Sequence, residues 1–300
     1  MNTIPEDRLA QPALITATVA VSFSAIFIRV AAADAFTIVW LRMSLATVML
    51  LPFARIRRPR WSSWKRDDLL AITVGGILLA GHFLLWTASL NYTSIATSVL
   101  LVSLHPLVVA PVSAVMHRDR FLRRDAAALI LGLMGTCVTC MGDVQLSGRA
   151  LFGDLLALGG AACLAAYLLN GRRLRASLPV VPYSAHLYAV VAVVAALVAA
   201  GSGKAHLPSV RSLLACLALA AVCTVGGHTV YNWALRHVAA LTVSLAFLGE
   251  APLTAVWALL IFSAVPPPST VAGGALILGG LFLAVTRRSP GLGARPIAVE

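Results

Sequence analysis

About ten stretches of roughly twenty apolar residues run through nearly the whole chain. A helix rises about 1.5 Å per residue, so each stretch is long enough to cross a hydrocarbon layer about 30 Å thick. The predicted spans are residues 12–32, 35–53, 68–90, 94–116, 126–142, 153–170, 181–201, 210–235, 239–262 and 269–286. Because little chain remains for a soluble domain, we predict an all-α polytopic membrane protein with ten transmembrane helices in a lipid bilayer.

The charges of the chain lie mainly between these stretches. Only 11% of the residues are charged and 60% are hydrophobic, whereas soluble globular domains have about 25% charged residues. The net charge of +12 would suggest nucleic acid as the partner of a soluble protein, but most of the cations here occupy alternate loops. Outside the spans, the opposite side holds only Arg149, Lys204 and Arg211. The positive-inside rule therefore predicts that both termini are cytoplasmic, and no nucleic-acid partner is expected.

Two sequence features recur at one spacing. The pair Gly81-His82 recurs as Gly227-His228, and Pro106 recurs as Pro252, both 146 residues later. Glycine and proline are common in membrane helices, so coincidence is the alternative, but the shared spacing favours a repeat. We expect two five-helix repeats, residues 1–142 and 153–286, followed by a cytoplasmic tail, residues 287–300. Since five is odd, the second repeat enters the membrane from the opposite side and is inverted.

The fourth predicted span of each half contains a proline near the middle of the membrane. Pro106 and Pro252 each remove a backbone hydrogen bond and are expected to kink their helices. The carbonyl groups that they free need partners, which a water-lined cavity between the helices can supply. Inverted repeats around such a cavity are typical of carriers that work by alternating access, because the two halves can exchange conformations.

Three segments resemble a known family. Residues 89–106, with the sequence SLNYTSIATSVLLVSLHP, resemble the third-to-fourth-helix segment of EamA-type carriers in the drug/metabolite transporter superfamily. Arg42 matches an arginine common in that family, and residues 273–280, GGALILGG, resemble its final helix. Overall similarity is greatest to the branch that exports aromatic amino acids.

The resemblance implies a fold and a function. Such proteins are ten-helix carriers with two inverted five-helix halves, and many of them export amino acids, metabolites or toxic compounds from bacteria. Helices one, three, four, six, eight and nine surround the substrate cavity. By this resemblance the chain is expected in the bacterial inner membrane as a multi-pass protein with a small-molecule substrate.

Glu250 is the only acidic residue predicted deep inside a span. An ionised carboxylate at the centre of a bilayer costs at least about 2.5 kcal/mol on insertion scales, so such residues are usually functional or paired. Glu250 can be a proton-carrying group coupled to transport or a counter-charge for a substrate ammonium. The structural alternatives are an ion pair with Arg42 and a hydrogen bond near Pro252.

The family often has a Gly-Glu pair that closes the fourth helix of each half, whereas Gly249-Glu250 lies in the middle of the ninth span.

Arg42 lies about a third of the way into the second span. A guanidinium at that depth needs a carboxylate, freed carbonyl groups or water as its partner. It can bind the carboxylate of a substrate with two parallel hydrogen bonds. The alternatives are a structural pair and a side chain that extends toward the interface.

Histidines and aromatic residues within the spans are further candidates for the cavity wall. Imidazole groups inside membrane helices act either as proton relays or as satisfied hydrogen-bonding groups, and tyrosine or tryptophan rings serve as substrate contacts, packing groups or interface anchors. The candidate substrate-binding residues of the central cavity are Arg42, His82, Trp86, His105, Tyr167, Tyr231, Phe247 and Glu250. His228 is a weaker candidate than His82 and His105.

The motifs of other function classes are missing from the sequence. There is no GxxxxGK[ST] phosphate loop, so ATP hydrolysis by this chain is not expected, and no GxSxG or HExxH motif of an intramembrane enzyme occurs. No cofactor, metal site or catalytic residue is expected. The sequence therefore predicts a secondary transporter that exports small amphipathic solutes, with hydrophobic or aromatic amino acids first and drugs or organic cations as the alternative. Import, protons as a coupling ion, and a monomer or a homodimer all stay open.

Overall fold

The computed structural model describes residues 6–56, 64–116, 121–141, 148–202 and 208–286, and the regular structure in these residues is entirely helical. Several predicted loop cations and the tail 287–300 lie outside the described residues. The helices in chain order are α1 (Glu6–Ser22), α2 (Ser24–Ala31), α3 (Ala35–Ile56), α4 (Arg66–Ser89), α5 (Ile95–Val102), α6 (His105–Met116), α7 (Arg123–Thr139), α8 (Gly148–Arg175), α9 (Val180–Gly201), α10 (Val210–Ala218), η2 (Leu219–His228), α11 (Thr229–Ala234), α12 (Ala240–Leu248), α13 (Glu250–Phe262) and α14 (Pro268–Val285).

Within the described residues, nine helical segments are long and apolar enough to cross a membrane. They are α1 with α2, α3, α4, α5 with α6, α8, α9, α10 through α11, α12 with α13, and α14. The predicted all-α polytopic class is thereby confirmed. The remaining predicted span, residues 126–142, falls on α7, which has 17 residues and begins with the charged residues Arg123, Arg124 and Asp125.

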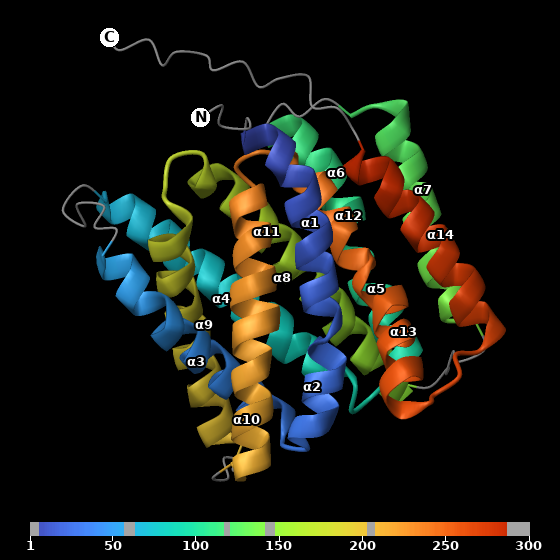
Figure 1. Cartoon of the computed structure of the whole chain (residues 1–300), viewed down its shortest axis with the longest axis horizontal. Coiled ribbons are helices and arrows are strands. Elements are labelled where there is room, and N and C mark those ends of the chain that lie inside the picture. The colour runs from blue at the N-terminus through green and yellow to red at the C-terminus, as the bar shows by residue number, and fades with distance from the viewer. Residues whose placement is uncertain (1–5, 57–63, 117–120, 142–147, 203–207, 287–300) are drawn as a thin grey trace.

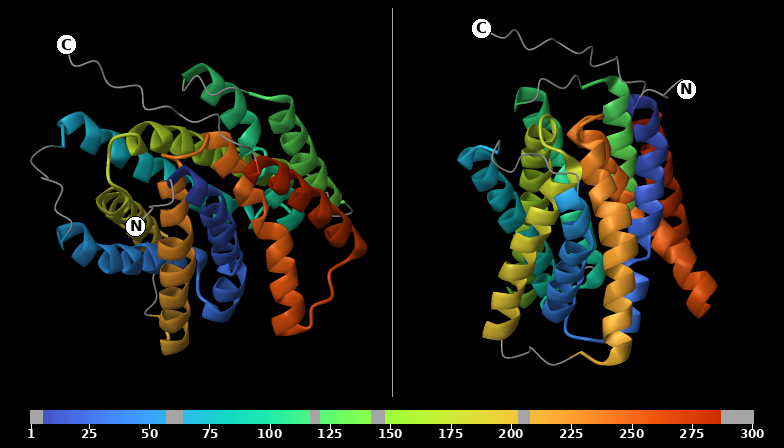
Figure 2. Two further views of the ribbon diagram at one scale, coloured as in Figure 1. Left: turned by 45° about the horizontal axis from the view of Figure 1, so that its top comes forward. Right: turned by 60° about the vertical axis from the view of Figure 1, so that its left-hand side comes forward.

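These helices form one bundle with connections at its two ends (Figures 1 and 2). α7 packs along α14 at one edge, α3 packs along α9 at the other, and α4 lies against α8 between them. α1 begins and α14 ends at the same end of the bundle, the upper end in Figure 1. Large apolar side chains on the outer surface are exposed, such as Val48 at 63% and Leu197 at 69%, as expected for a surface that faces acyl chains.

Small residues allow the closest helix contacts. A Cβ atom on Gly135 of α7 would lie 2.5 Å from the carbonyl oxygen of Gly273 on α14, so only glycine fits there. A Cβ atom on Gly153 of α8 would likewise lie 2.8 Å from the backbone nitrogen of Thr93. In a bilayer the hydrophobic effect does not hold helices together, so this close backbone packing is what stabilises the bundle.

Two membrane segments are interrupted near a proline. α5 ends at Val102 and α6 begins at His105, just before Pro106; α12 ends at Leu248 and α13 begins at Glu250, just before Pro252. Proline has no N–H to donate to the carbonyl four residues earlier. Each interruption places polar backbone in the interior of the bundle, beside the candidate residues His105 and Glu250.

Candidate functional site

Arg42 is buried in the bundle interior, with 5% of its surface exposed. Its Nε donates a hydrogen bond to Oγ1 of Thr224 at 2.6 Å, and its guanidinium carbon lies 5.2 Å from the centroid of the Phe83 ring. Its Nη2 has no hydrogen-bond partner among the described residues. One edge of this guanidinium is therefore held by the protein, while one strong donor is left for a ligand.

The partner of Arg42 lies on η2, a π-helix. Oγ1 of Thr224 also donates to the carbonyl of Leu219 at 3.3 Å, and Oγ1 of Thr229 donates to the carbonyl of Thr224 at 3.2 Å; both bonds reach back five residues. π-helical segments are rare and are frequent at functional sites, because they change the direction of side chains relative to an α-helix. Here the π-helix presents Thr224 to Arg42 on α3.

A chain of rings continues from Phe83 across the bundle. The Phe83 ring lies 5.9 Å from that of His228, His228 lies 5.6 Å from Phe247, and Phe247 lies 4.3 Å from Tyr231 and 6.3 Å from His105. These rings come from α4, η2, α11, α12 and α6. They form an aromatic wall near the interruptions of the α5–α6 and α12–α13 segments.

His105 and His82 each donate one hydrogen bond to a backbone carbonyl. Nδ1 of His105 lies 3.0 Å from the oxygen of Val102, which is the carbonyl left free by Pro106. Nδ1 of His82 lies 3.0 Å from the oxygen of Gly160 on α8. A carbonyl only accepts, so Nδ1 carries the proton in both rings. Nε2 of His105 is buried and makes no hydrogen bond of normal geometry to a described residue, with the backbone of Ser244 close to the ring.

Trp86 lies one helical turn after His82 on α4. The two rings are stacked, with their centroids 6.1 Å apart. Nε1 of Trp86 is buried and has no hydrogen-bond partner within the described part of the chain. The indole therefore adds a second donor without an acceptor to the interior.

Glu250 is the first residue of α13 and follows the interruption at Gly249. Its side chain is partly exposed, and it makes no hydrogen bond or ion pair with another residue that the structure describes. The charge of Arg42 acts on it electrostatically without direct contact. Arg42 and Glu250 thus lie in one interior without a direct bond to each other.

The residues on either side of Glu250 along the chain have different surroundings. Phe247 faces the rings described above, whereas Thr254 and Trp257 pack on the interruption between α1 and α2. Oγ1 of Thr254 donates to the carbonyl of Ser22 at 2.7 Å, and Nε1 of Trp257 donates to Oγ of Ser22 at 2.8 Å. Thr254 and Trp257 therefore hold α13 against α1.

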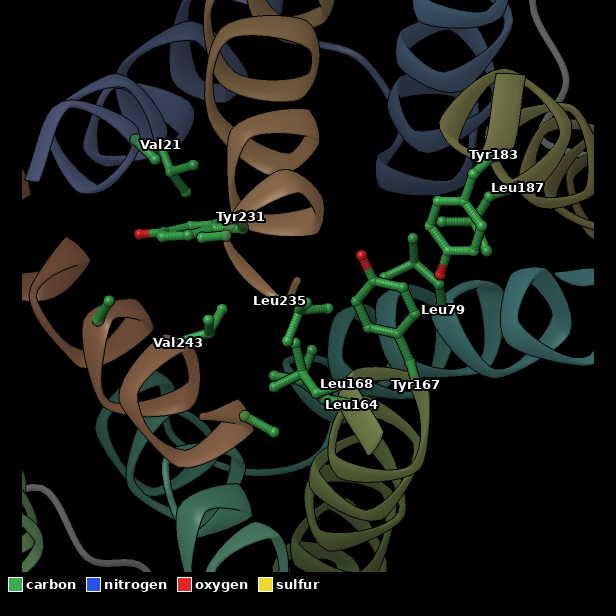
Figure 3. Packing of buried hydrophobic residues seen from close by; sticks show 14 of the residues in the cluster. Val21, Leu79, Leu164, Tyr167, Leu168, Tyr183, Leu187, Tyr231, Leu235 and Val243 are labelled. Carbon is green, nitrogen blue, oxygen red and sulfur yellow. The ribbon is translucent and has the colours of Figure 1, made fainter. Parts of the chain in front are cut away.

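The two tyrosine candidates lie in different places. Tyr231 donates to Oγ1 of Thr18 on α1 at 2.9 Å and touches Phe247. Tyr167 donates to Oδ1 of Asn232 at 2.5 Å and lies near Tyr183. In Figure 3 the rings of Tyr167 and Tyr183 point toward each other, on the opposite side of the view from Tyr231. The structure brings the other candidates together, whereas Tyr167 lies in a neighbouring polar cluster around Asn232 that joins the central site through Tyr188.

Phe83, Thr224 and Thr18 also belong to this site, although the sequence did not single them out. Phe83 follows His82 directly, which is the only signal that pointed to it. A π-helix leaves no simple sequence pattern, so the direction of Thr224 was not predictable. Within the described residues, no group of three or more His, Cys, Asp or Glu side chains is placed to hold a metal ion.

Comparisons with known proteins agree with this architecture. The model of the EamA-like transporter family matches residues 9–141 and 151–286. An uncharacterized transporter of Archaeoglobus fulgidus is 24% identical over 276 residues, which cover 89% of this chain and 93% of that protein. A solved crystal structure superposes with a TM-score of 0.79 at 20% identity, over 92% of this chain and 96% of that one; at this identity the likeness shows the fold alone.

Proposed function

The chain belongs to the EamA-like transporter family, and from this membership we propose that it exports small amphipathic solutes, hydrophobic or aromatic amino acids above all, across the bacterial inner membrane. One observation carries the proposal. An unpaired carboxylate, Glu250, and a guanidinium with a free donor, Arg42, stand apart beside an aromatic wall inside the membrane. An amino acid has the opposite charges and an apolar side chain, so it complements this arrangement.

In the proposed complex, Nη2 of Arg42 donates to the carboxylate of the solute and Glu250 accepts from its ammonium. Phe247 and Phe83 contact the apolar side chain, and Trp86 contributes a further donor. Buried donors without acceptors are unfavourable in an empty interior, which supports a polar ligand at this place. Tyr231 lies behind Phe247 and supports the wall.

We also propose that the chain is an inverted repeat of ten transmembrane helices, with α7 as the tenth. One family model matches both halves separately. The packing is reciprocal: α4 of the first half lies on α8 of the second, as η2 of the second lies on α1 of the first. α1 begins and α14 ends at the same end of the bundle (Figure 1), so the chain must cross the membrane an even number of times. The nine candidate spans of the described residues are an odd number, and α7 supplies the tenth crossing.

Transport in this proposal proceeds by alternating access. The interruptions before Pro106 and Pro252 lie in corresponding helices of the halves, residues 1–142 and 153–286, so a rocking motion can bend both segments at the same depth. A gradient of the solute or of protons supplies the energy, with Glu250 as the proton-carrying group in the second case. Both termini are then cytoplasmic, and the carrier works as a monomer or a homodimer.

A second candidate substrate is a drug or another organic cation. It is favoured by the fact that Arg42 is already engaged by Thr224 and Phe83, whereas Glu250 has no partner among the described residues. A cation needs only Glu250 and the aromatic wall.

The test is counterflow in proteoliposomes that contain the purified protein. Vesicles loaded with unlabelled L-phenylalanine are expected to accumulate labelled L-phenylalanine transiently and with saturation, with and without a pH gradient. A panel of amino acids and aromatic amines identifies the preferred class. Counterflow of amines without any counterflow of amino acids would favour the second candidate, and the absence of counterflow with every solute would refute both.

A further inference from the structure

A second guanidinium, that of Arg175, is buried in the polar cluster around Tyr167. Arg175 ends α8 and is only 1% exposed. Its Nε donates to the carbonyl of Asn232 at 3.0 Å, and its guanidinium carbon lies 5.9 Å from the centroid of the Tyr183 ring. Tyr183, a neutral phenol near pH 7, acts on it electrostatically, and the nearby cation Arg236 repels it.

This guanidinium lies beside groups that have no acceptor. Nη1 of Arg175 and the hydroxyl of Tyr183 are both buried without a hydrogen-bond partner in the described part of the chain. The neighbouring Arg173 is exposed, as cations at the cytoplasmic end of a membrane helix usually are. An arginine whose role is only to mark the end of the helix would not need to be buried, and a buried cation without an anion is unfavourable. The two free donors and the positive charge fit a carboxylate.

The cluster is continuous with the central site. Asn232 accepts from Tyr167 at 2.5 Å, its Nδ2 lies 3.5 Å from the hydroxyl of Tyr188, and that hydroxyl lies 3.1 Å from Oγ1 of Thr229. Tyr188 in turn interacts electrostatically with Arg42. A line of polar groups therefore leads from Arg42 to Arg175 at the end of the bundle where α1 begins.

We propose that Arg175 is a second carboxylate-binding residue of the transport path. It takes the carboxylate of the solute on the way between Arg42 and the face of the membrane at which α1 begins. When that end of the bundle opens, the bonds from Arg175 and Tyr167 to Asn232 break and the guanidinium becomes available. This assignment rests on the proposed function, since it requires a solute with a carboxylate.

The experiment measures saturation from each face separately. The protein is expressed in bacteria, and uptake of labelled L-phenylalanine is followed in inside-out and in right-side-out membrane vesicles. Cleavage of an N-terminal tag by added protease identifies the vesicles in which the face of α1 is outside. The variant is Arg175→Gln, and Arg173→Gln on the same helix end is the matched control.

Arg175→Gln is expected to raise the half-saturating concentration about tenfold or more at the face of α1, since a charge-assisted hydrogen bond is lost. At the opposite face the change stays within about twofold, and Arg173→Gln has no effect at either face. Tyr183→Phe gives a smaller rise at the same face. Inhibition by phenethylamine, which has no carboxylate, stays as in the wild type for Arg175→Gln.

Equal effects of Arg175→Gln at both faces, or an equal loss of inhibition by phenethylamine, would overturn the assignment. If Arg175→Gln does not accumulate in the membrane, Arg175→Lys and Tyr183→Phe replace it. The assignment fails if both of these variants have the half-saturating concentrations of the wild type at both faces. Failure of the wild type to take up any carboxylate-bearing solute refutes the proposed function, whereas normal uptake by the wild type with an unaltered Arg175→Gln refutes only the role of Arg175.

Discussion

Glu250 and Arg42 share one interior but not one hydrogen bond. Arg42 donates to Thr224 at 2.6 Å instead of to the carboxylate, and Glu250 is left without a partner in the described residues. Opposite charges in a low-dielectric interior attract strongly, so a structural ion pair would be expected to close this gap. In the proposed function, a solute that carries both charges binds to the two groups at once.

Replacement of Glu250 by glutamine tests the role of its charge. Glu250→Gln keeps the size of the side chain and is expected to lower the uptake of a solute with an ammonium about tenfold or more, because the charged acceptor is lost. If Glu250 carries a coupling proton, its loss also removes the dependence of uptake on pH. Uptake in proteoliposomes between about pH 6 and pH 8 measures both effects.

Asp67→Asn is the control for this charge change. Asp67 is exposed in the first turn of α4, and its neutralisation is expected to leave uptake unaltered. Wild-type rates and an unaltered pH profile for Glu250→Gln would remove Glu250 from the mechanism.

The hydrogen bond from Arg42 to Thr224 is expected to orient the guanidinium for its ligand. Thr224→Val preserves shape but removes the acceptor, and it should raise the half-saturating concentration about three- to tenfold, as the loss of one hydrogen bond produces. Thr47→Val on α3 is the control, because it loses only a bond to the carbonyl of Met43 in its own helix. Equal effects of the two substitutions on half-saturation would contradict the orienting role.

Helix packing in this bundle depends on particular glycines. A Cβ on Gly135 would meet the backbone of α14 at 2.5 Å, whereas a Cβ on Gly279 would meet nothing within 4 Å. α7 is short and carries charges at its start, so its close contact with α14 holds it in the bundle. Oγ1 of Thr286, just after α14, accepts from Nη2 of Arg124 on α7 and strengthens the same pair of helices.

Two alanine substitutions with opposite expected signs test this contact. Gly135→Ala should lower stability by about 1–3 kcal/mol, because backbones must separate to admit the methyl group. Gly279→Ala should be neutral or slightly stabilising, since alanine favours the helix over glycine by up to about 1 kcal/mol. Thermal unfolding of the purified variants in detergent measures both effects. A Gly135→Ala variant as stable as the wild type would contradict the claim that this close contact between α7 and α14 stabilises the bundle.

The proposed even number of membrane crossings is a property of the whole molecule. If α7 crosses the membrane, both ends of the chain lie on the cytoplasmic side, as the loop cations predict. Fusions of green fluorescent protein and of alkaline phosphatase to each terminus report the side directly. The fluorescent fusions are expected to be active and the phosphatase fusions inactive at both ends. Activity of the phosphatase at one end only would refute the ten-helix proposal.

Sequence alone determined the membrane class, the family and the helix interruptions to be expected near Pro106 and Pro252. These follow from local properties: twenty apolar residues must span or be buried, and a proline cannot donate a backbone hydrogen bond. The sequence also singled out Arg42 and Glu250, because charges within apolar runs are rare. What remained open was which partners these charges have.

Only the tertiary structure decided those partners. Arg42 donates to Thr224, which lies 182 residues further along the chain. Thr224 belongs to a π-helix, and no sequence pattern predicted this π-helix. Tyr167 resembled the other aromatic candidates in the sequence but lies in a neighbouring polar cluster, where it shares Asn232 with Arg175. Side chains on different helices meet according to helix rotation, kinks and close glycine contacts, and these depend on the packing of the entire bundle rather than on any single span.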